Sequence, residues 1–172
     1  MPPFTRPATA LLSAALLTGA LVGCGSSGVA VPGTETLDAA DRQACTDLLE
    51  SLGTELGTLS ARAEPDLEAG TAVFGDPSSL NQEDDVTVVC GAVAPDGLEA
   101  TSACDAVQGV GWYTPTEQLD DPGGGAVSTT VEFSPRVSVV FPATERGDAG
   151  FSVLTALAAP VKEHLERVTT CK

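Results

Sequence analysis

Apolar residues between positions 39 and 56 recur with the spacing of an α-helix. The residues that share one side of that helix are Ala44, Leu48, Leu49, Leu52 and Leu56. Asp38 or Asp41 stands at the start of the run, where a carboxylate can accept hydrogen bonds from the free amides of the first turn. We therefore predict a helix over residues 39–56, weakened in its last turns by Gly53 and Gly57.

After a polar stretch, the pattern changes from a helical period to a period of two. Five short runs have strand character: residues 71–74, 85–93, 106–114, 126–133 and 136–142. In the fourth run Val127, Thr129 and Val131 alternate with polar residues, as in a strand with one buried face. The runs follow one another without helices between them, which predicts an antiparallel sheet of about five strands.

The last segment returns to the helical period. Its apolar stripe consists of Phe151, Leu154, Ala158, Val161, Leu165 and Val168. Pro160 inside this run predicts a kink or a break, because proline lacks the amide hydrogen that a helix interior uses. With one helix before the strands and one after them, we predict an α+β fold in which the N-terminal and C-terminal helices cover one face of the sheet.

The N-terminus carries an apolar run of a different kind. Residues 8–22 contain Ala, Leu, Val, Gly, Ser and Thr alone, and Arg6 is the single charged side chain among residues 1–23. A basic start followed by such a run is typical of a secretory signal peptide, and the run is shorter than the roughly 20 residues of a membrane-spanning helix. Residues 1–23 are therefore predicted to be removed on export.

The end of this run, Leu21-Val22-Gly23-Cys24, resembles the lipobox of bacterial lipoproteins. The resemblance implies that the Cys24 thiol takes a diacylglyceryl group and that Cys24 becomes the first residue after cleavage. Acyl chains in a bilayer contribute about 0.8 kcal/mol per buried CH₂, so this lipid would hold the protein on the extracytoplasmic face of the cell membrane. Residues 24–37 then form the lipidated cysteine and a flexible tether, and residues 38–172 a single globular domain. The alternative is an ordinary cleaved signal peptide.

The charge of the exported part excludes some partners. Removal of residues 1–23 leaves 149 residues with all 24 acids and seven of the eight bases, a net charge of −17. A domain this negative is not expected to bind nucleic acid, whose phosphates require lysine and arginine. It is also not expected to adsorb to anionic lipid headgroups, so the anchor would supply the affinity for the membrane.

Four cysteines remain in the exported domain: Cys45, Cys90, Cys104 and Cys171. An even number in an exported domain predicts two disulfides. A zinc site is disfavoured, because there is no Cys-x-x-Cys pair and the single histidine, His164, stands apart from all four. Three pairings are possible. We favour Cys90–Cys104, which bracket a short loop between two strand-like runs, with Cys45–Cys171 joining the ends of the domain.

Candidate catalytic residues are few. The chain has no nucleophile elbow, no metalloprotease motif and no phosphate-binding loop. His164 lies among charged residues on the predicted last helix, and we interpret it as solvated. The many Asp and Glu residues provide carboxylates that could catalyse glycoside hydrolysis, but none of them is marked out by apolar surroundings in the sequence. The acidic stretches 81–85 and 119–125 are candidate Ca²⁺ loops, although neither has the spacing of the twelve-residue calcium loop. We predict no cofactor and no metal site.

Residues 108–114, QGVGWYT, hold the single Trp and the single Tyr of the chain. Neighbouring side chains of a strand face opposite sides, so we predict that Trp112 is buried under the helices and that Tyr113 faces away from them. Arg136 begins the last strand, and sequential strands usually pair. Tyrosine and arginine are enriched at binding surfaces, so we predict that Tyr113 and Arg136 form a small recognition patch. The simpler interpretation makes Tyr113 an ordinary surface residue.

Four motifs in order resemble the DUF3515 family: FGDP (74–77), VVCG (88–91), CDAVQGVGW (104–112) and RVSVVFP (136–142). The resemblance covers roughly residues 41–167 and implies an exported or lipid-anchored protein of high-GC Gram-positive bacteria, without implying a reaction. Together with the residues above, it predicts a membrane-anchored, non-catalytic binding or scaffolding module that contacts an envelope protein or a cell-wall ligand. The alternatives are a carboxylate-based cell-wall enzyme or enzyme accessory, and a Ca²⁺-dependent envelope protein.

Overall fold

A computed structural model of the chain describes residues 36–99 and 102–171. Its elements are, in chain order, α1 (Ala39–Ser51), β1 (Glu55–Leu56), β2 (Leu59–Ala61), β3 (Thr71–Gly75), η1 (Gln82–Asp84), β4 (Val86–Ala92), β5 (Asp105–Val107), β6 (Val110–Tyr113), α2 (Thr116–Leu119), β7 (Ala126–Thr130), β8 (Phe133–Ser134), β9 (Arg136–Phe141), η2 (Ala143–Glu145), α3 (Asp148–His164) and β10 (Glu166–Arg167). Here η marks a short 3₁₀-helix. The predicted α+β class with an antiparallel sheet is confirmed.

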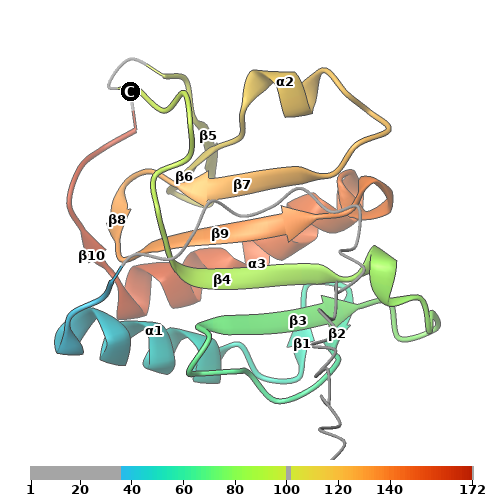
Figure 1. Cartoon of the computed structure of the whole chain (residues 1–172), viewed down its shortest axis with the longest axis horizontal. Coiled ribbons are helices and arrows are strands. Elements are labelled where there is room, and N and C mark those ends of the chain that lie inside the picture. Colours follow the sequence, from blue (N-terminus) through green and yellow to red (C-terminus); the bar gives the residue numbers. More distant parts are fainter. Residues whose placement is uncertain (1–35, 100–101, 172) are drawn as a thin grey trace, which may run out of the picture.

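The sheet is larger than the sequence pattern predicts. Within the described residues it has eight strands in the order β1-β2-β3-β4-β9-β7-β6-β5, and each neighbouring pair is antiparallel (Figure 1). β8 and β10 form a separate two-stranded pair. The expectation of about five strands is therefore wrong.

Tight turns account for the additional strands. The predicted run 106–114 is a hairpin, β5–β6, because Gln108 and Gly109 both have positive φ (49° and 79°) and reverse the chain as a two-residue turn. Gly57, at φ 63°, opens the two-residue turn between β1 and β2 in a stretch where we expect helix and then irregular chain. The strands of both hairpins are only two to four residues long, too short for the pattern of hydrophobic positions to predict them.

The two long helices begin and end for local reasons. Asp38 caps α1, since its carboxylate accepts hydrogen bonds from the amides of Ala40 and Asp41 at 2.8 and 2.9 Å. α1 ends at Ser51, ahead of the predicted Leu56. α3 runs through Pro160 without being split into two helices.

The C-terminal end of α3 also differs from the prediction, which extends the helix to Val168. α3 ends at His164, because the next residues, Glu166 and Arg167, pair with β8 as β10. Val168 and Phe151, both expected on the buried stripe, are 56% and 61% exposed.

One hydrophobic core lies between the sheet and the two long helices. α3 lies behind β4 and β9 in Figure 1, and α1 contacts both α3 and β4. The largest fully buried side chains include Trp112, Phe74, Leu48, Leu49 and Leu157. Trp112 is 1% exposed and belongs to this core, on the helix side of the sheet.

Two disulfides join the cysteines, but with a pairing different from the one we favour from sequence. Cys45 of α1 is bonded to Cys90 of β4, and Cys104 to Cys171. Cys90 and Cys104 do not meet, because β9, β7 and β6 lie between β4 and β5 in the sheet. The short loop between these cysteines therefore crosses the sheet instead of connecting neighbouring strands.

A buried carboxylate fastens the end of the described chain. The Glu132 side chain is 5% exposed. Its Oε1 accepts hydrogen bonds from Arg167 Nη1 at 2.7 Å and from the Cys171 amide at 2.8 Å, and its Oε2 accepts one from the Gly111 amide at 2.8 Å. The Arg167 guanidinium also lies over the Phe133 ring, 4.7 Å from its centroid. Glu132 thus ties the C-terminal segment to β6, the strand next to the β5 edge of the sheet.

No helix among the described residues is long and apolar enough to cross a membrane. The predicted signal peptide, Cys24 and most of the predicted tether lie outside the described residues.

Candidate functional site

The sheet has a face turned away from α1 and α3, which we call the distal face. Antiparallel partners point to the same side of a sheet, so the register assigns side chains to each face. One row on the distal face consists of Val73, Thr87, Val140 and Val127, and the next of Thr71, Val89, Ser138, Thr129 and Tyr113. In the second row the hydroxyls of Thr129 and Ser138 are buried and lie 2.8 Å apart in a hydrogen bond.

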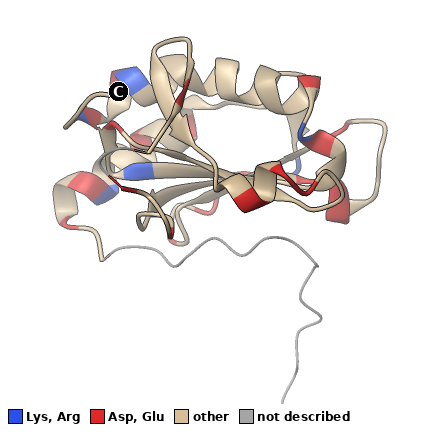
Figure 2. Cartoon of the chain, turned by 90° about the horizontal axis from the view of Figure 1, so that it is seen from above, with Lys and Arg blue, Asp and Glu red and all other residues tan. Residues whose placement is uncertain are grey.

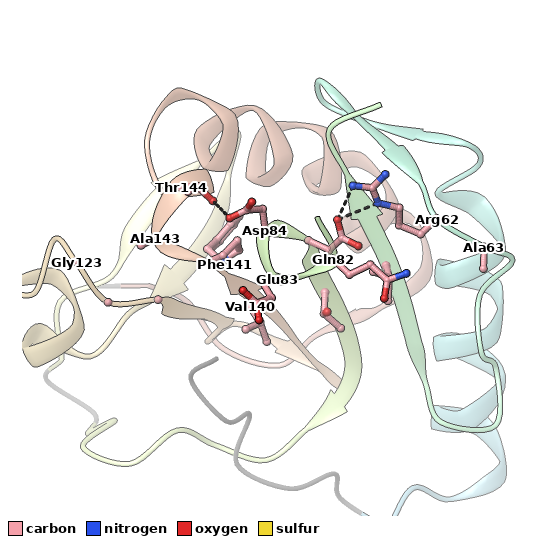
Figure 3. Close-up of a pocket in the computed structure, with 16 residues that line it drawn as sticks. Arg62, Ala63, Gln82, Glu83, Asp84, Gly123, Val140, Phe141, Ala143 and Thr144 are labelled. Atoms are coloured by element: carbon pink, nitrogen blue, oxygen red, sulfur yellow. Dashed lines mark hydrogen bonds and ion pairs between the residues drawn. The ribbon is translucent and has the colours of Figure 1, made fainter. Parts of the chain in front are cut away.

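The first row leads into a groove of about 940 Å³, the distal groove (Figure 3). Its floor is formed by the half-buried side chains of Val73, Thr87 and Val140, which follow one another across β3, β4 and β9. Gly123 and Arg62 lie at opposite ends of the view in Figure 3, with the η1 residues between them. The floor is therefore largely apolar, and the walls are polar.

An arginine–aspartate pair closes one end of the distal groove. Asp85 Oδ1 accepts hydrogen bonds from Arg62 Nε at 2.9 Å and Nη2 at 2.7 Å, and Arg62 Nη1 donates to the Ser79 carbonyl at 2.9 Å. The Asp85 side chain is 6% exposed and that of Arg62 is 23% exposed. The pair lies directly against Gly75, where an added Cβ would overlap both Asp85 Oδ1 and the guanidinium. The glycine of the FGDP motif thus provides the space for this ion pair.

Asp84 lies on the η1 wall of the groove and is held from two sides. Its Oδ1 accepts a hydrogen bond from the Thr144 hydroxyl at 3.0 Å, and its Oδ2 one from Asn81 Nδ2 at 2.6 Å (Figure 3 draws the Thr144 bond). Thr144 belongs to η2, so this bond joins the two 3₁₀-helices across 60 residues of sequence. The position of Asp84 is therefore set by tertiary structure.

The region around the groove carries a concentrated negative charge. Burial raises the pKa of Glu145 above its ordinary value, and the charges of Asp76, Asp84 and Asp85 raise that pKa further. Hydrogen bonds from Ser78 lower the pKa of Asp76, which keeps that carboxylate ionised. Figure 2 shows acidic residues on many surface segments and few basic ones. The charges of Asp76, Asp84 and Asp85 thus act together on Glu145, which directly follows the groove residue Thr144.

The two acidic stretches singled out in the sequence meet at this groove. Gln82, Glu83, Asp84 and Asp85 come from the first stretch, and Gly123–Gly125 from the second. Across residues 36–99 and 102–171, no group of three His, Cys, Asp or Glu side chains is placed so that it could hold a metal ion.

Tyr113 and Arg136 lie on the distal face, but they are not an exposed pair. Tyr113 aligns with Thr129 and Ser138 across the strands, and Arg136 lies two residues before Ser138 on β9, so their side chains share this face. Both are half-buried, and an added Cβ at Gly97 would lie 3.2 Å from the Tyr113 hydroxyl. Arg136 lines a separate hollow of about 280 Å³. A recognition role for Tyr113 and Arg136 stays a prediction.

The remaining sequence candidate, His164, occupies the last turn of α3, is half-buried and does not line the distal groove.

Arg62 is the groove residue that sequence reasoning misses. It follows β2 in the polar stretch that we expect to be irregular, and it is the single base among residues 60–70 beside three acids. A lone arginine within an acidic stretch is a usable signal for an ion pair. Its partner, 23 residues away, cannot be read from the sequence.

The described chain is therefore an α+β domain, with two helices on one face of an antiparallel sheet and an acid-walled groove on the other. It belongs to the DUF3515 family, described as a protein family of unknown function, whose model matches residues 7–170. Comparison with curated proteins finds no match, and comparison with solved structures finds none either.

Proposed function

We propose that this chain is a lipid-anchored, non-catalytic binding module on the extracytoplasmic face of the cell membrane, and that the distal groove is its ligand site. The observation that carries the proposal is the groove itself, which combines a half-buried apolar floor with the carboxylate of Asp85. Ligand sites are typically hollows of 300–1,000 Å³, largely apolar, with a few well-placed polar groups. The distal groove has these properties.

The hydrogen bonds of the groove favour binding over catalysis. Asp85 is paired with Arg62, and both carboxylate oxygens of Asp84 accept side-chain hydrogen bonds. A general acid or base must exchange a proton with its substrate during each turnover, and a carboxylate oxygen that already accepts a hydrogen bond from Arg62, Thr144 or Asn81 is less available for that exchange. We therefore assign Asp84 and Asp85 to recognition of a ligand.

The two alternatives make different predictions for the purified protein. A carboxylate-based cell-wall enzyme would release soluble fragments from peptidoglycan, and Asp84→Asn would abolish that release. A Ca²⁺-dependent envelope protein would melt at a lower temperature after addition of a chelator. The binding module is expected to show neither effect.

The membrane anchor is supported by the lipobox-like end of the N-terminal apolar run. We expect Cys24→Ala to move the protein from the membrane fraction to the soluble fraction, or to stall it as the unprocessed precursor, because the acyl acceptor is gone. Fractionation and immunoblotting of cells producing either form check this, with Cys24→Ser as a second variant lacking the thiol. A Cys24→Ala protein that is processed normally and stays in the membrane would contradict the anchor.

A further inference from the structure

A second hollow, of about 440 Å³, lies where the last strand of the sheet meets the start of α3, and we call it the edge pocket. Its walls come from β5, α2, β7 and the first two turns of α3. β5 and α2 lie at the same end of the sheet in Figure 1. Because β5 is the final strand in the sheet order, no further strand of the described chain covers its outer side.

Two large apolar side chains at the edge pocket face solvent. Phe151 on α3 is 61% exposed, and Leu119 on α2 is 53% exposed. Leu154 and Val107 continue this apolar lining inward, where both pack against the hydrophobic core. Exposed apolar side chains that border one hollow mark it as a place where a partner can bind.

The outer side of β5 can pair with another strand. Gly111 of β6 donates its amide to Glu132 at 2.8 Å, and its carbonyl accepts from the Val131 amide at 3.1 Å, on the β7 side. Ala106 is the β5 partner of Gly111, so its own amide and carbonyl point away from β6. Ala106 is exposed, and these two groups have no hydrogen-bond partner among residues 36–99 and 102–171. An extended peptide is the ligand that such a strand edge accepts.

Arg146 gives the edge pocket a positive charge that no neighbouring carboxylate balances. Its Nη1 donates to the carbonyls of Asp121 and Gly124, and its Nη2 donates to the carbonyl of Gln118. These three bonds leave two of the five guanidinium N–H groups for a ligand. Although the chain has 24 acids, none of those in its described part lies at ion-pair distance from this guanidinium. The other charged residue of the lining, Asp105, is exposed on the β5 side, so the Arg146 end of the pocket favours a carboxylate.

We infer that the edge pocket binds an extended segment of a partner protein, which adds to β5 as a further strand. The backbone of this segment pairs with Ala106, and a large apolar side chain lies between Phe151 and Leu119. An acidic side chain two positions along the segment contacts Arg146. Side chains two positions apart in an extended chain share one face, so both of them reach the pocket. The site is separate from the distal groove and goes beyond the proposed function.

Three labelled peptides of equal length test this inference on the full chain in detergent. In the parent peptide, leucine and glutamate alternate on one face with serine between them. The two matched peptides have glutamine in place of glutamate, or serine in place of leucine. We expect the parent peptide to bind by fluorescence anisotropy and to shift the NMR signals of Ala106 and Val107. The glutamine peptide should bind roughly 3-fold more weakly, as for a partly exposed ion pair, and the serine peptide should not bind measurably.

Substitutions in the protein test the same contacts. Phe151→Ser is expected to weaken binding of the parent peptide roughly 10-fold, because it removes apolar contact area. Ala106→Pro is expected to weaken binding roughly 5-fold, because it removes the outward amide and leaves the β6 pairing in place. The matched control is Leu80→Ser, which replaces an apolar side chain that is 97% exposed outside the pocket, and it should leave binding unchanged. Melting curves verify that each variant is folded.

The outcomes separate this inference from the proposed function. Equal binding of the three peptides, or binding that Phe151→Ser leaves unchanged, would overturn the edge pocket and leave the distal groove untouched. Peptide-induced shifts at Val73, Thr87 and Val140 in place of Ala106 would assign the peptide to the distal groove and overturn the inference as well. A dimer of the protein that light scattering detects without peptide, and that Phe151→Ser dissociates, would replace the partner protein by a second copy of this chain.

Discussion

Joint replacement of Cys45 and Cys90 by serine is expected to lower the free energy of unfolding by about 4 kcal/mol. The disulfide joins residues 45 positions apart, and its removal returns the corresponding loop-closure entropy to the unfolded chain. Both cysteines are buried, at 4% and 2% exposure, so the bond also fixes α1 against the centre of the sheet. Urea unfolding of the oxidised protein, followed by circular dichroism, measures the difference.

A reducing agent provides the control for this prediction. It should destabilise the double variant less than the native chain, because the variant has one disulfide fewer to lose. Peptide mapping without reduction should recover Cys45 linked to Cys90 and Cys104 linked to Cys171. A Cys90–Cys104 peptide, or a double variant as stable as the native chain, would contradict this assignment.

Glu132→Ala is expected to cost about 3 kcal/mol of folding stability. The substitution leaves the Cys171 and Gly111 amides without their acceptor and removes the carboxylate that pairs with Arg167, whose Nη2 still donates to the Gly109 carbonyl. Because Arg167 is 41% exposed, most of the loss is assigned to the two amides and not to the ion pair. The same unfolding measurement, with hydrogen exchange at Val168 and Thr169, reports the cost and the release of the C-terminal segment.

Glu166→Ala is the matched control for Glu132→Ala. Glu166 is an exposed acid on β10, one residue from Arg167, and its removal should change stability by no more than about 0.5 kcal/mol. Equal effects of the two substitutions would indicate general charge relief in an acidic chain, and the assignment of Glu132 as the fastening residue would be wrong.

Helices and strands whose hydrophobic pattern extends over many residues can be predicted from the sequence, whereas the tight turns cannot. The α1 pattern with its Asp38 cap and the alternation along β7 and β9 each extend over enough residues to stand out. The two-residue turns at Gln108–Gly109 and after Leu56 depend on positive φ values, which residue type predicts only weakly outside Asn-Gly and Asp-Gly. The turn at Gln108–Gly109 divides one predicted strand into β5 and β6. The turn after Leu56 joins β1 to β2, where the sequence pattern predicts the end of a helix.

The disulfide pairing and the distal groove depend on strand order, which a single sequence does not contain. In the sheet, β9, β7 and β6 lie between β4 and β5, so three strands separate Cys90 on β4 from Cys104, which directly precedes β5. The same order brings the stretch at Glu83–Asp85 opposite Gly123–Gly125. The acidic stretches were visible as candidates, but their meeting over an apolar floor follows from tertiary structure.

The central proposal, that the distal groove is the ligand site, is tested most directly by photocrosslinking in living cells. A photoreactive amino acid at Gly123, exposed on the groove wall, is compared with the same amino acid at Val168, which is exposed away from the groove. The account predicts that the Gly123 position crosslinks to an envelope protein or a cell-wall ligand, which mass spectrometry identifies. It also predicts that Glu83→Gln with Asp84→Asn removes this crosslink. A crosslink shared by both positions, or one that persists in the double variant, would contradict it.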